Sequence, residues 1–159
     1  MATSFSRSFF RLLQRIQHIG NRLWRPVTMG VRAVVLDGDN RIFLVRHSYV
    51  PGWHLPGGGV EPGETALASL GRELEEEGNI EMTGPAELLG LYFNDKGSDR
   101  DHVAVYVVRQ FHQSGPRKPD WEIVESGFYP LDALPEGTTR ATLSRLAELA
   151  GKAAKSDHW

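Results

Sequence analysis

The chain has no cysteine among its 159 residues. This absence excludes a disulfide scaffold, a cysteine nucleophile and a thiolate metal site. The six histidines show no HxxxH-type spacing, so we expect any metal to be a hard ion held by oxygen, such as Mg²⁺ or Mn²⁺. The length and the ordinary globular composition predict one domain with a substantial core.

Acidic residues are missing from the first 36 positions, which hold six arginines. The overall net charge of −2 is therefore a cancellation, because the remaining 123 residues carry 12 basic and 20 acidic side chains, a net charge of −8. An acidic domain does not favour the phosphate backbone, so we expect no stable complex with nucleic acid.

Long hydrophobic runs are also missing from the arginine-containing leader. Its apolar residues recur at helical spacing over residues 4–24, with the basic residues opposite, which predicts an amphipathic helix ended by Pro26. Runs of two apolar residues are too short for a membrane span or a secretory signal. Three interpretations stay open: docking on the acidic domain, contact with an anionic membrane surface or a protein partner, and a mitochondrial-type presequence. We expect a cytoplasmic protein, with peripheral membrane attachment, organellar import and a homodimer left open.

The rest of the chain alternates between strand and helix patterns, which predicts an α/β fold with two helices around a mixed sheet. We divide the chain into a leader (1–26), a domain (27–151) and a flexible tail (152–159). The expected elements are a β-hairpin formed by strands 27–36 and 41–46, a Gly/Pro-rich loop over 47–64, a helix over 65–78, strands over 86–93, 102–111 and 121–129, and a helix over 138–151.

Three carboxylates, Glu73, Glu76 and Glu77, stand at positions i, i+3 and i+4 of the predicted helix over 65–78. They share one helix face, where each like-charge pair costs a few tenths of a kcal/mol unless a cation offsets the repulsion. A run of acids is often only a solvated helix face. Here, however, a glycine-rich loop precedes it, and bare backbone lets a phosphate or metal approach closely. Loop and helix together suggest metal-assisted attack on a phosphoanhydride.

The residues around this cluster resemble the signature of Nudix hydrolases, GX5EX7REUXEEXGU, in which U is aliphatic. The matching run is Gly58-x5-Glu64-x7-Arg72-Glu73-Leu74-x-Glu76-Glu77-x-Asn79-Ile80. The single departure is Asn79, where the family has glycine; asparagine tolerates the left-handed conformation, so we expect a small stability cost. The resemblance covers about residues 27–150 and implies a Nudix α/β/α sandwich with a mixed sheet.

The resemblance also implies roles for individual residues. The metal ligands would be the Gly57 carbonyl together with Glu73, Glu76 and Glu77. Arg72 would hold these ligands in place by pairing with Glu76 or Glu64. The catalytic set is Glu76, Arg72 and a general base, which lies either in the box or at Glu122 or Glu125 on a later segment. The candidate substrate-binding residues are Arg32, Arg46, Trp53, Gly58 and Glu64.

The implied function is hydrolysis of the diphosphate linkage of a nucleoside diphosphate derivative, by water attack on phosphorus with Mg²⁺ or Mn²⁺. A small nucleotide, such as an oxidised NTP or ADP-ribose, is the expected substrate. The alternative is a catalytically inactive Nudix-fold sensor or interaction module. All four box carboxylates are retained, which favours the enzyme. An isopentenyl diphosphate isomerase on the same fold would need a cysteine, which this chain lacks.

Overall fold

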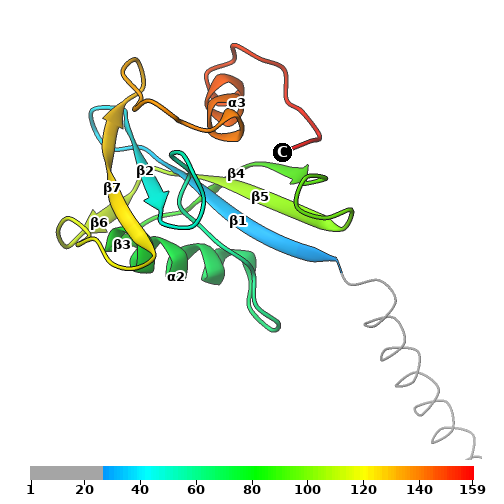
Figure 1. The fold of residues 1–159 in the computed structure, drawn as a ribbon, viewed down its shortest axis with the longest axis horizontal. Helices are drawn as coiled ribbons and strands as arrows, with labels where there is room; N and C mark the ends of the chain where they lie inside the picture. The colour runs from blue at the N-terminus through cyan, green and yellow to red at the C-terminus, as the bar shows by residue number, and fades with distance from the viewer. Residues whose placement is uncertain (1–26) are drawn as a thin grey trace, which may run out of the picture.

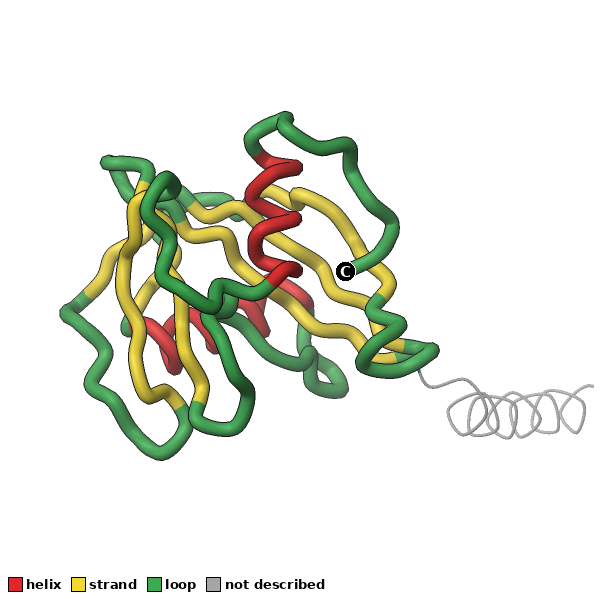
Figure 2. The backbone as a smooth tube through the Cα atoms, turned by 45° about the horizontal axis from the view of Figure 1, so that its top comes forward, coloured by secondary structure: helices red, strands yellow, loops and turns green. Residues whose placement is uncertain are grey.

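The computed structural model describes residues 27–159. The helix predicted over residues 4–24 lies outside the described residues. Two helices lie on opposite sides of the strands: α2 (Ala66–Gly78) covers one face and α3 (Arg140–Leu149) the other, as Figure 1 and the tube in Figure 2 show. This is the predicted α/β/α arrangement.

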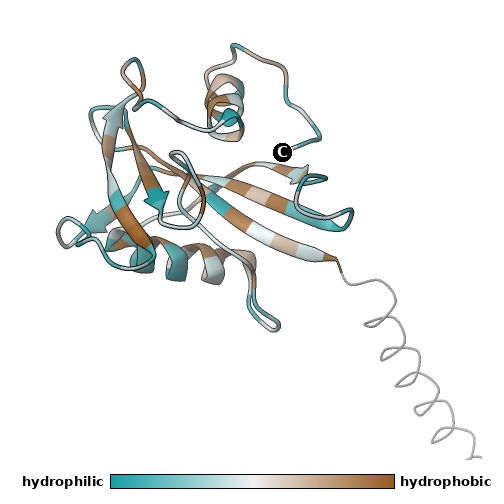
Figure 3. Ribbon diagram, in the orientation of Figure 1, coloured by the Kyte–Doolittle hydropathy of each residue, from teal (hydrophilic) through white to brown (hydrophobic). Residues whose placement is uncertain are grey.

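The central sheet has three strands in the order β1-β5-β4. Its strands are β1 (Thr28–Val35), β5 (Asp101–Val108) and β4 (Glu87–Phe93). β1 runs parallel to β5 and β4 runs antiparallel to it, so the sheet is mixed as predicted. The hydropathy colouring of Figure 3 shows hydrophobic residues along β4 and β5, which fits a sheet covered on both faces.

Two smaller sheets complete the domain. β2 (Arg41–His47) pairs antiparallel with β7 (Ile123–Pro130), and β3 (Ile80–Met82) pairs antiparallel with β6 (Phe111–Gln113). The strand expected over 102–111 is therefore two strands, β5 and β6.

The predicted hairpin between strands 27–36 and 41–46 is wrong. Only a bridge between Leu36 and Ile42 joins the two segments, because β1 pairs with β5 and β2 pairs with β7. The turn between them is real: the Asp37 carboxylate accepts hydrogen bonds from the backbone of Asp39 and Arg41. After this turn the chain enters another sheet, in which β2 is buried along most of its length.

Two hydrophobic cores lie on the two faces of the central sheet. Leu70 and Leu74 of α2 pack with Val31 and Val35 on one face. On the other face, the cluster around Val34 is joined by partly buried residues from α3 and the end of the chain, namely Leu146, Leu149 and Trp159. β1 thus contributes to both cores, which explains its near-continuous apolar sequence.

Helix α2 is capped at both ends. Thr65 accepts a hydrogen bond from the Ala68 N–H at 3.1 Å, which is an N-cap. Asn79 ends the helix with φ 52° and ψ 36°, the left-handed conformation expected from the sequence. Its side-chain amide also donates to the Gly115 carbonyl oxygen at 3.3 Å.

Residues 152–159, which the sequence predicts to be a flexible tail, make defined contacts with the domain. This segment runs beside β4, where the Phe93 N–H donates to the Asp157 carbonyl at 2.8 Å and the Trp159 N–H donates to the Phe93 carbonyl at 2.9 Å. Lys155 Nζ donates to the Leu89 carbonyl at 2.8 Å. The otherwise open edge of β4 supplies the backbone N–H and carbonyl groups of these hydrogen bonds, which local sequence patterns do not reveal. In residues 27–159, no helix combines the length and apolarity needed to cross a membrane.

Candidate active site

The glycine-rich loop lies along the free edge of β1. The Val31 N–H donates to the Gly58 carbonyl at 2.9 Å, and the Ala33 N–H donates to the Pro56 carbonyl at 2.9 Å. Gly57 has φ +135°, and a Cβ there would lie 2.1 Å from the Val31 carbonyl oxygen. Only glycine fits this position, because the clash would be with rigid backbone in a conformation that other residues avoid.

The same loop brings bare backbone against the acidic face of α2. A Cβ on Gly58 would lie 2.2 Å from Glu73 Oε1, so the missing side chain leaves room for a carboxylate. Glycine at position 58 is thus explained by a close approach between loop and helix.

Glu77 is the most enclosed of the three acids, with 5% of its surface exposed. Its Oε2 accepts a hydrogen bond from the Gly57 N–H at 2.7 Å. Burial raises the pKa of Glu77 to about 7, although the Gly57 N–H and the Arg32 charge oppose the rise. A carboxyl with this pKa carries a proton about half of the time near neutrality.

His47 lies beside Glu77, with 3.5 Å between Nε2 and Glu77 Oε1. Burial lowers the pKa of His47 to about 4, helped by the positive charge of Arg32 and by His54. The imidazole is therefore neutral near pH 7. The contact is polar and does not form a salt bridge at that pH.

Arg72 joins the remaining box carboxylates. Its guanidinium lies 2.8 Å from Glu73 Oε1, 3.1 Å from Glu64 Oε1 and 3.4 Å from Glu76 Oε2. A further N–H donates to the Gly59 carbonyl at 3.3 Å. The hydrogen bond from Arg72 is the main reason that the pKa of Glu64 is lowered. The sequence offered Glu76 or Glu64 as partners, and Arg72 contacts both.

The acidic face opens into a cavity of about 280 Å³. It is lined by Glu73, Glu76, Glu77, Arg117, Glu122 and Ile123. Glu122 directly precedes β7, and β7 contacts α2. Glu125 instead forms an ion pair with Arg46 at 2.7 Å between β7 and β2, and it does not line this cavity. Of the two candidate bases, only Glu122 therefore shares the cavity with the helix acids.

Sequence analysis missed Arg117. Its guanidinium donates to the Glu76 carbonyl oxygen and lies 2.6 Å from Asp120 Oδ2. The pKa of Asp120 is lowered to about 2, first by a backbone hydrogen bond from Ile123 and then by Arg117. Arg117 thus braces the last turn of α2, where a cation interacts favourably with the helix dipole. Its loop position in the sequence carried no signal of this contact.

The carboxylates are the hard oxygen donors that Mg²⁺ and Mn²⁺ prefer. Across the described part of the chain, however, no three acidic or imidazole groups already converge on one point at ligand distance. The hydrogen bonds above give the reason: Gly57 holds Glu77, and Arg72 holds Glu73 and Glu76. The donor set fits a hard divalent cation, which would exchange these hydrogen bonds for metal contacts.

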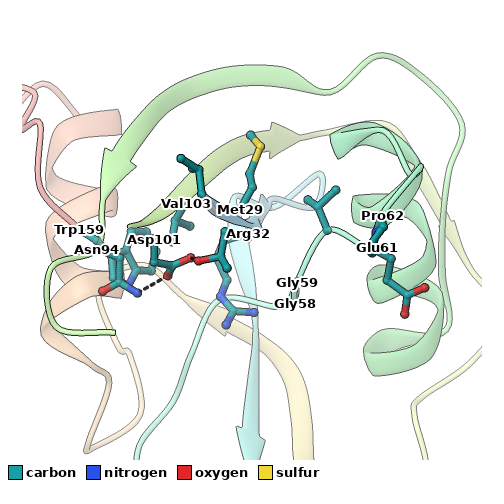
Figure 4. A pocket seen from close by; sticks show the side chains of 14 residues that line it. Met29, Arg32, Gly58, Gly59, Glu61, Pro62, Asn94, Asp101, Val103 and Trp159 are labelled. Carbon is teal, nitrogen blue, oxygen red and sulfur yellow. Dashed lines mark hydrogen bonds between the residues drawn. The ribbon is translucent and has the colours of Figure 1, made fainter. Parts of the chain in front are cut away.

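A second, larger cavity of about 710 Å³ adjoins the glycine loop (Figure 4). Arg32, Gly58 and Gly59 lie on its loop side, while Asn94, Asp101 and Trp159 lie on the other. Arg32 Nη1 is buried and has no hydrogen-bond partner among the described residues. A buried donor without a partner is costly, so an anionic ligand would relieve this cost.

Two predicted substrate contacts, Trp53 and Arg46, line neither of these cavities. Trp53 is 6% exposed and belongs to the hydrophobic core, where its ring centroid lies 4.9 Å from that of Tyr129. The Arg46 guanidinium lies 5.7 Å from the centroid of the Trp53 ring. Arg32, Gly58 and Glu64, in contrast, lie at or beside the acidic face.

Comparison with known proteins matches this architecture. The model of the NUDIX domain family matches residues 26–149. Since that match covers most of the chain, the chain belongs to the NUDIX domain family, and the resemblance seen in the sequence is confirmed.

The names of related proteins describe several different activities. The chain is 38% identical over 76 residues to a putative 8-oxo-dGTP diphosphatase of Bacillus subtilis, covering 48% of this chain and 50% of that protein. It is 40% identical over 106 residues to an RNA pyrophosphohydrolase of Pelagibacter ubique, covering 57% and 66%. It is 33% identical over 111 residues to an ADP-ribose pyrophosphatase of Methanocaldococcus jannaschii, covering 65% of each. The chain thus spans from half to about two thirds of these relatives.

Solved structures agree with the fold. A MutT NUDIX hydrolase from Burkholderia pseudomallei superposes with a TM-score of 0.67 at 28% identity, covering 79% of this chain and 99% of that one. An ADP-ribose pyrophosphatase from Streptococcus suis superposes with a TM-score of 0.56 at 26% identity, covering 84% and 96%. The predicted Nudix α/β/α fold is therefore confirmed.

Proposed function

We propose that this chain is a metal-dependent pyrophosphohydrolase that cleaves the diphosphate linkage of a nucleoside diphosphate derivative. One observation carries the proposal: the carboxylates of α2 line one cavity, and a nucleotide-sized cavity is lined by Gly58, which packs against Glu73, and by Arg32, whose buried Nη1 has no hydrogen-bond partner among the described residues. Cavities of several hundred Å³ are typical of small-molecule sites. Oxygen ligands for a cation and a cationic donor for phosphate are the two elements that diphosphate chemistry needs.

Glu73, Glu76 and Glu77, with the Gly57 carbonyl, would hold Mg²⁺ or Mn²⁺. When bound, such an ion neutralises the diphosphate and makes a water more acidic. Arg72 keeps the carboxylates in place through its three ion pairs. Arg32 binds phosphate oxygens, and Glu122 takes the proton of the attacking water. The products are a nucleoside monophosphate and the remaining phosphorylated fragment.

The proposed substrate is a small nucleotide, with an oxidised NTP and ADP-ribose as first candidates. Relatives named for 8-oxo-dGTP and ADP-ribose support both. The net charge of −8 over residues 37–159 opposes long RNA, because an acidic surface repels its phosphates.

The test is turnover of a nucleotide panel with Mg²⁺ or Mn²⁺, comparing Glu76→Gln with Glu75→Gln. Both residues are exposed neighbours on α2, but only Glu76 lines the acidic cavity. We expect Glu76→Gln to lower kcat by roughly 100-fold or more and Glu75→Gln to change it less than about 3-fold, on the scale of lost electrostatic catalysis. A parent protein that binds nucleotides but hydrolyses none would favour the inactive sensor instead.

A further inference from the structure

We propose that Trp159 forms the nucleobase wall of the larger cavity, so that residues 152–159 are a base-binding part of the active site. We call this segment the strap. The inference rests on the proposed function for the kind of ligand, and on the described contacts for the geometry.

The cavity has a direction. Arg32 lies near the middle of the lining, and Gly58 packs against Glu73 of the acidic face, so the phosphates belong beside these two residues. Trp159 and Asn94 line one end of the cavity, and Glu61 and Pro62 line the other. Among residues 27–159, Trp159 is the one aromatic residue in the lining of this cavity, so a nucleotide with its diphosphate beside Arg32 finds its stacking surface toward Trp159.

The indole is placed for contact with a ligand. Trp159 is partly exposed, and its ring packs on the core with 6.1 Å between its centroid and that of Tyr92. One side of the ring is thus supported while the residue still lines the cavity. Aromatic side chains stack on the π-face of any base, which gives affinity without strict base selection.

A buried ion pair holds the strap in this position. Arg145 is 2% exposed, and its guanidinium lies 2.7 Å from Glu148 Oε1 and 3.8 Å from the centroid of the Tyr92 ring. Glu148 Oε2 accepts the Tyr92 hydroxyl hydrogen bond at 2.8 Å. Tyr92 has its pKa raised to about 12, by burial and then by Glu148.

Both members of the pair also bond to the strap backbone. Arg145 Nη1 donates to the His158 carbonyl at 3.0 Å, and the Ser156 N–H donates to Glu148 Oε1 at 3.1 Å. Buried ion pairs are weak sources of stability compared with apolar packing. Here the pair fixes the backbone on either side of Asp157. The Trp159 N–H also donates a hydrogen bond to the Phe93 carbonyl at 2.9 Å. The strap therefore presents Trp159 in one defined position.

The test compares Trp159→Ala and Trp159→Phe with Trp121→Ala as the matched control. Trp121 is 81% exposed and lines neither cavity. Each variant is assayed with a nucleoside triphosphate and with ADP-ribose. The base-free substrate is ribose triphosphate, which is the nucleoside triphosphate without its base. We expect Trp159→Ala to raise KM for the nucleotide by roughly 5- to 150-fold, the range that loss of one stacked base produces, with kcat changed less than about 3-fold. Trp159→Phe should recover most of the loss, and the base-free substrate and Trp121→Ala should show parental KM.

An unchanged nucleotide KM in Trp159→Ala would overturn the inference, as would an equal rise for the base-free substrate. Equilibrium binding of nucleoside monophosphates, measured in a chelator, separates this inference from the proposed function. If the parent hydrolyses no nucleotide but Trp159→Ala still weakens this binding, the proposed function is wrong and the nucleobase wall is supported. If Trp159→Ala binds as the parent does, or if the parent binds no nucleotide, the base wall is wrong. Should Trp159→Ala fail to fold, Trp159→Leu and Trp159→Phe decide by the same KM comparison.

Discussion

Replacing Glu77 by glutamine should make the metal-free protein more stable above neutral pH while removing a proposed metal ligand. Glu77 is buried, and its pKa is about 7 instead of the ordinary 4.5. The buried ionised form is therefore unfavourable by about 3 kcal/mol, at 1.36 kcal/mol per pKa unit. Glutamine keeps an oxygen that accepts the Gly57 N–H but carries no charge.

The sign of the pH dependence follows from where the protons bind. Between pH 4.5 and 7 the unfolded chain has released the Glu77 proton while the folded chain keeps it, so the parent loses stability as pH rises through this window. The stability of the glutamine variant has no such dependence. His47, whose pKa is lowered to about 4, is present in both proteins and acts in the opposite direction, because it destabilises the fold as pH falls below its ordinary 6.5. We expect the variant to match the parent near pH 4.5 and to exceed it by about 3 kcal/mol at pH 8.

Thermal unfolding in EDTA from pH 4.5 to 8 measures this difference. For a domain of this size, about 3 kcal/mol corresponds to a Tm increase of roughly 6–12 °C at pH 8. Glu76→Gln is the control, because the Glu76 side chain is 60% exposed and its charge is already solvated. Adding Mn²⁺ should raise the Tm of the parent more than that of Glu77→Gln. A variant that gains no stability between pH 5 and pH 8 relative to the parent would refute the reasoning.

Two further predictions concern the loop and the general base. Gly57→Ala should lower the free energy of unfolding by more than about 2 kcal/mol in urea denaturation, because its Cβ would lie 2.1 Å from the Val31 carbonyl oxygen, whereas Gly59→Ala, with no atom within 4 Å of the added Cβ, should cost less than about 1 kcal/mol. Equal losses would show that the loop does not hold this conformation. Glu122→Gln should lower kcat by about 100-fold and Glu125→Gln by less than about 3-fold in steady-state assays, because only Glu122 lines the acidic cavity. A larger loss of kcat in Glu125→Gln than in Glu122→Gln would identify Glu125 as the general base instead.

Local geometry explains why so much of the acidic face was predictable. The spacing of Glu73, Glu76 and Glu77 fixes their directions on any α-helix, whatever packs against it. The end of α2 at Asn79 was predictable for the same reason, since a left-handed residue stops a helix through contacts within one turn. Where the decisive contacts lie within about four residues, the sequence contains the information directly.

Long-range pairing was not predictable in this way. Turn residues at Asp37–Asn40 suggested a hairpin, but strand choice depends on which other strands compete, and β5 and β7 lie far along the chain. Whether Glu122 or Glu125 faces α2 likewise depends on how β7 crosses the helix. The position of the strap depends on the open edge of β4 and on the buried Arg145. Neither feature can be inferred from the sequence of residues 152–159, which is that of a polar tail.

The site combines rigid placement with carboxylates that remain free to exchange partners. Each of the three helix acids is held by a group of this chain, Glu77 by a backbone amide and Glu73 and Glu76 by Arg72. These contacts lower the mutual repulsion that would otherwise splay the acids apart. They also mean that a cation must displace hydrogen bonds when it binds. Arg72 contacts Glu64 as well, so it keeps an anchor outside the three acids and stays in place during such an exchange. The guanidinium therefore suits a permanent brace better than a substrate contact.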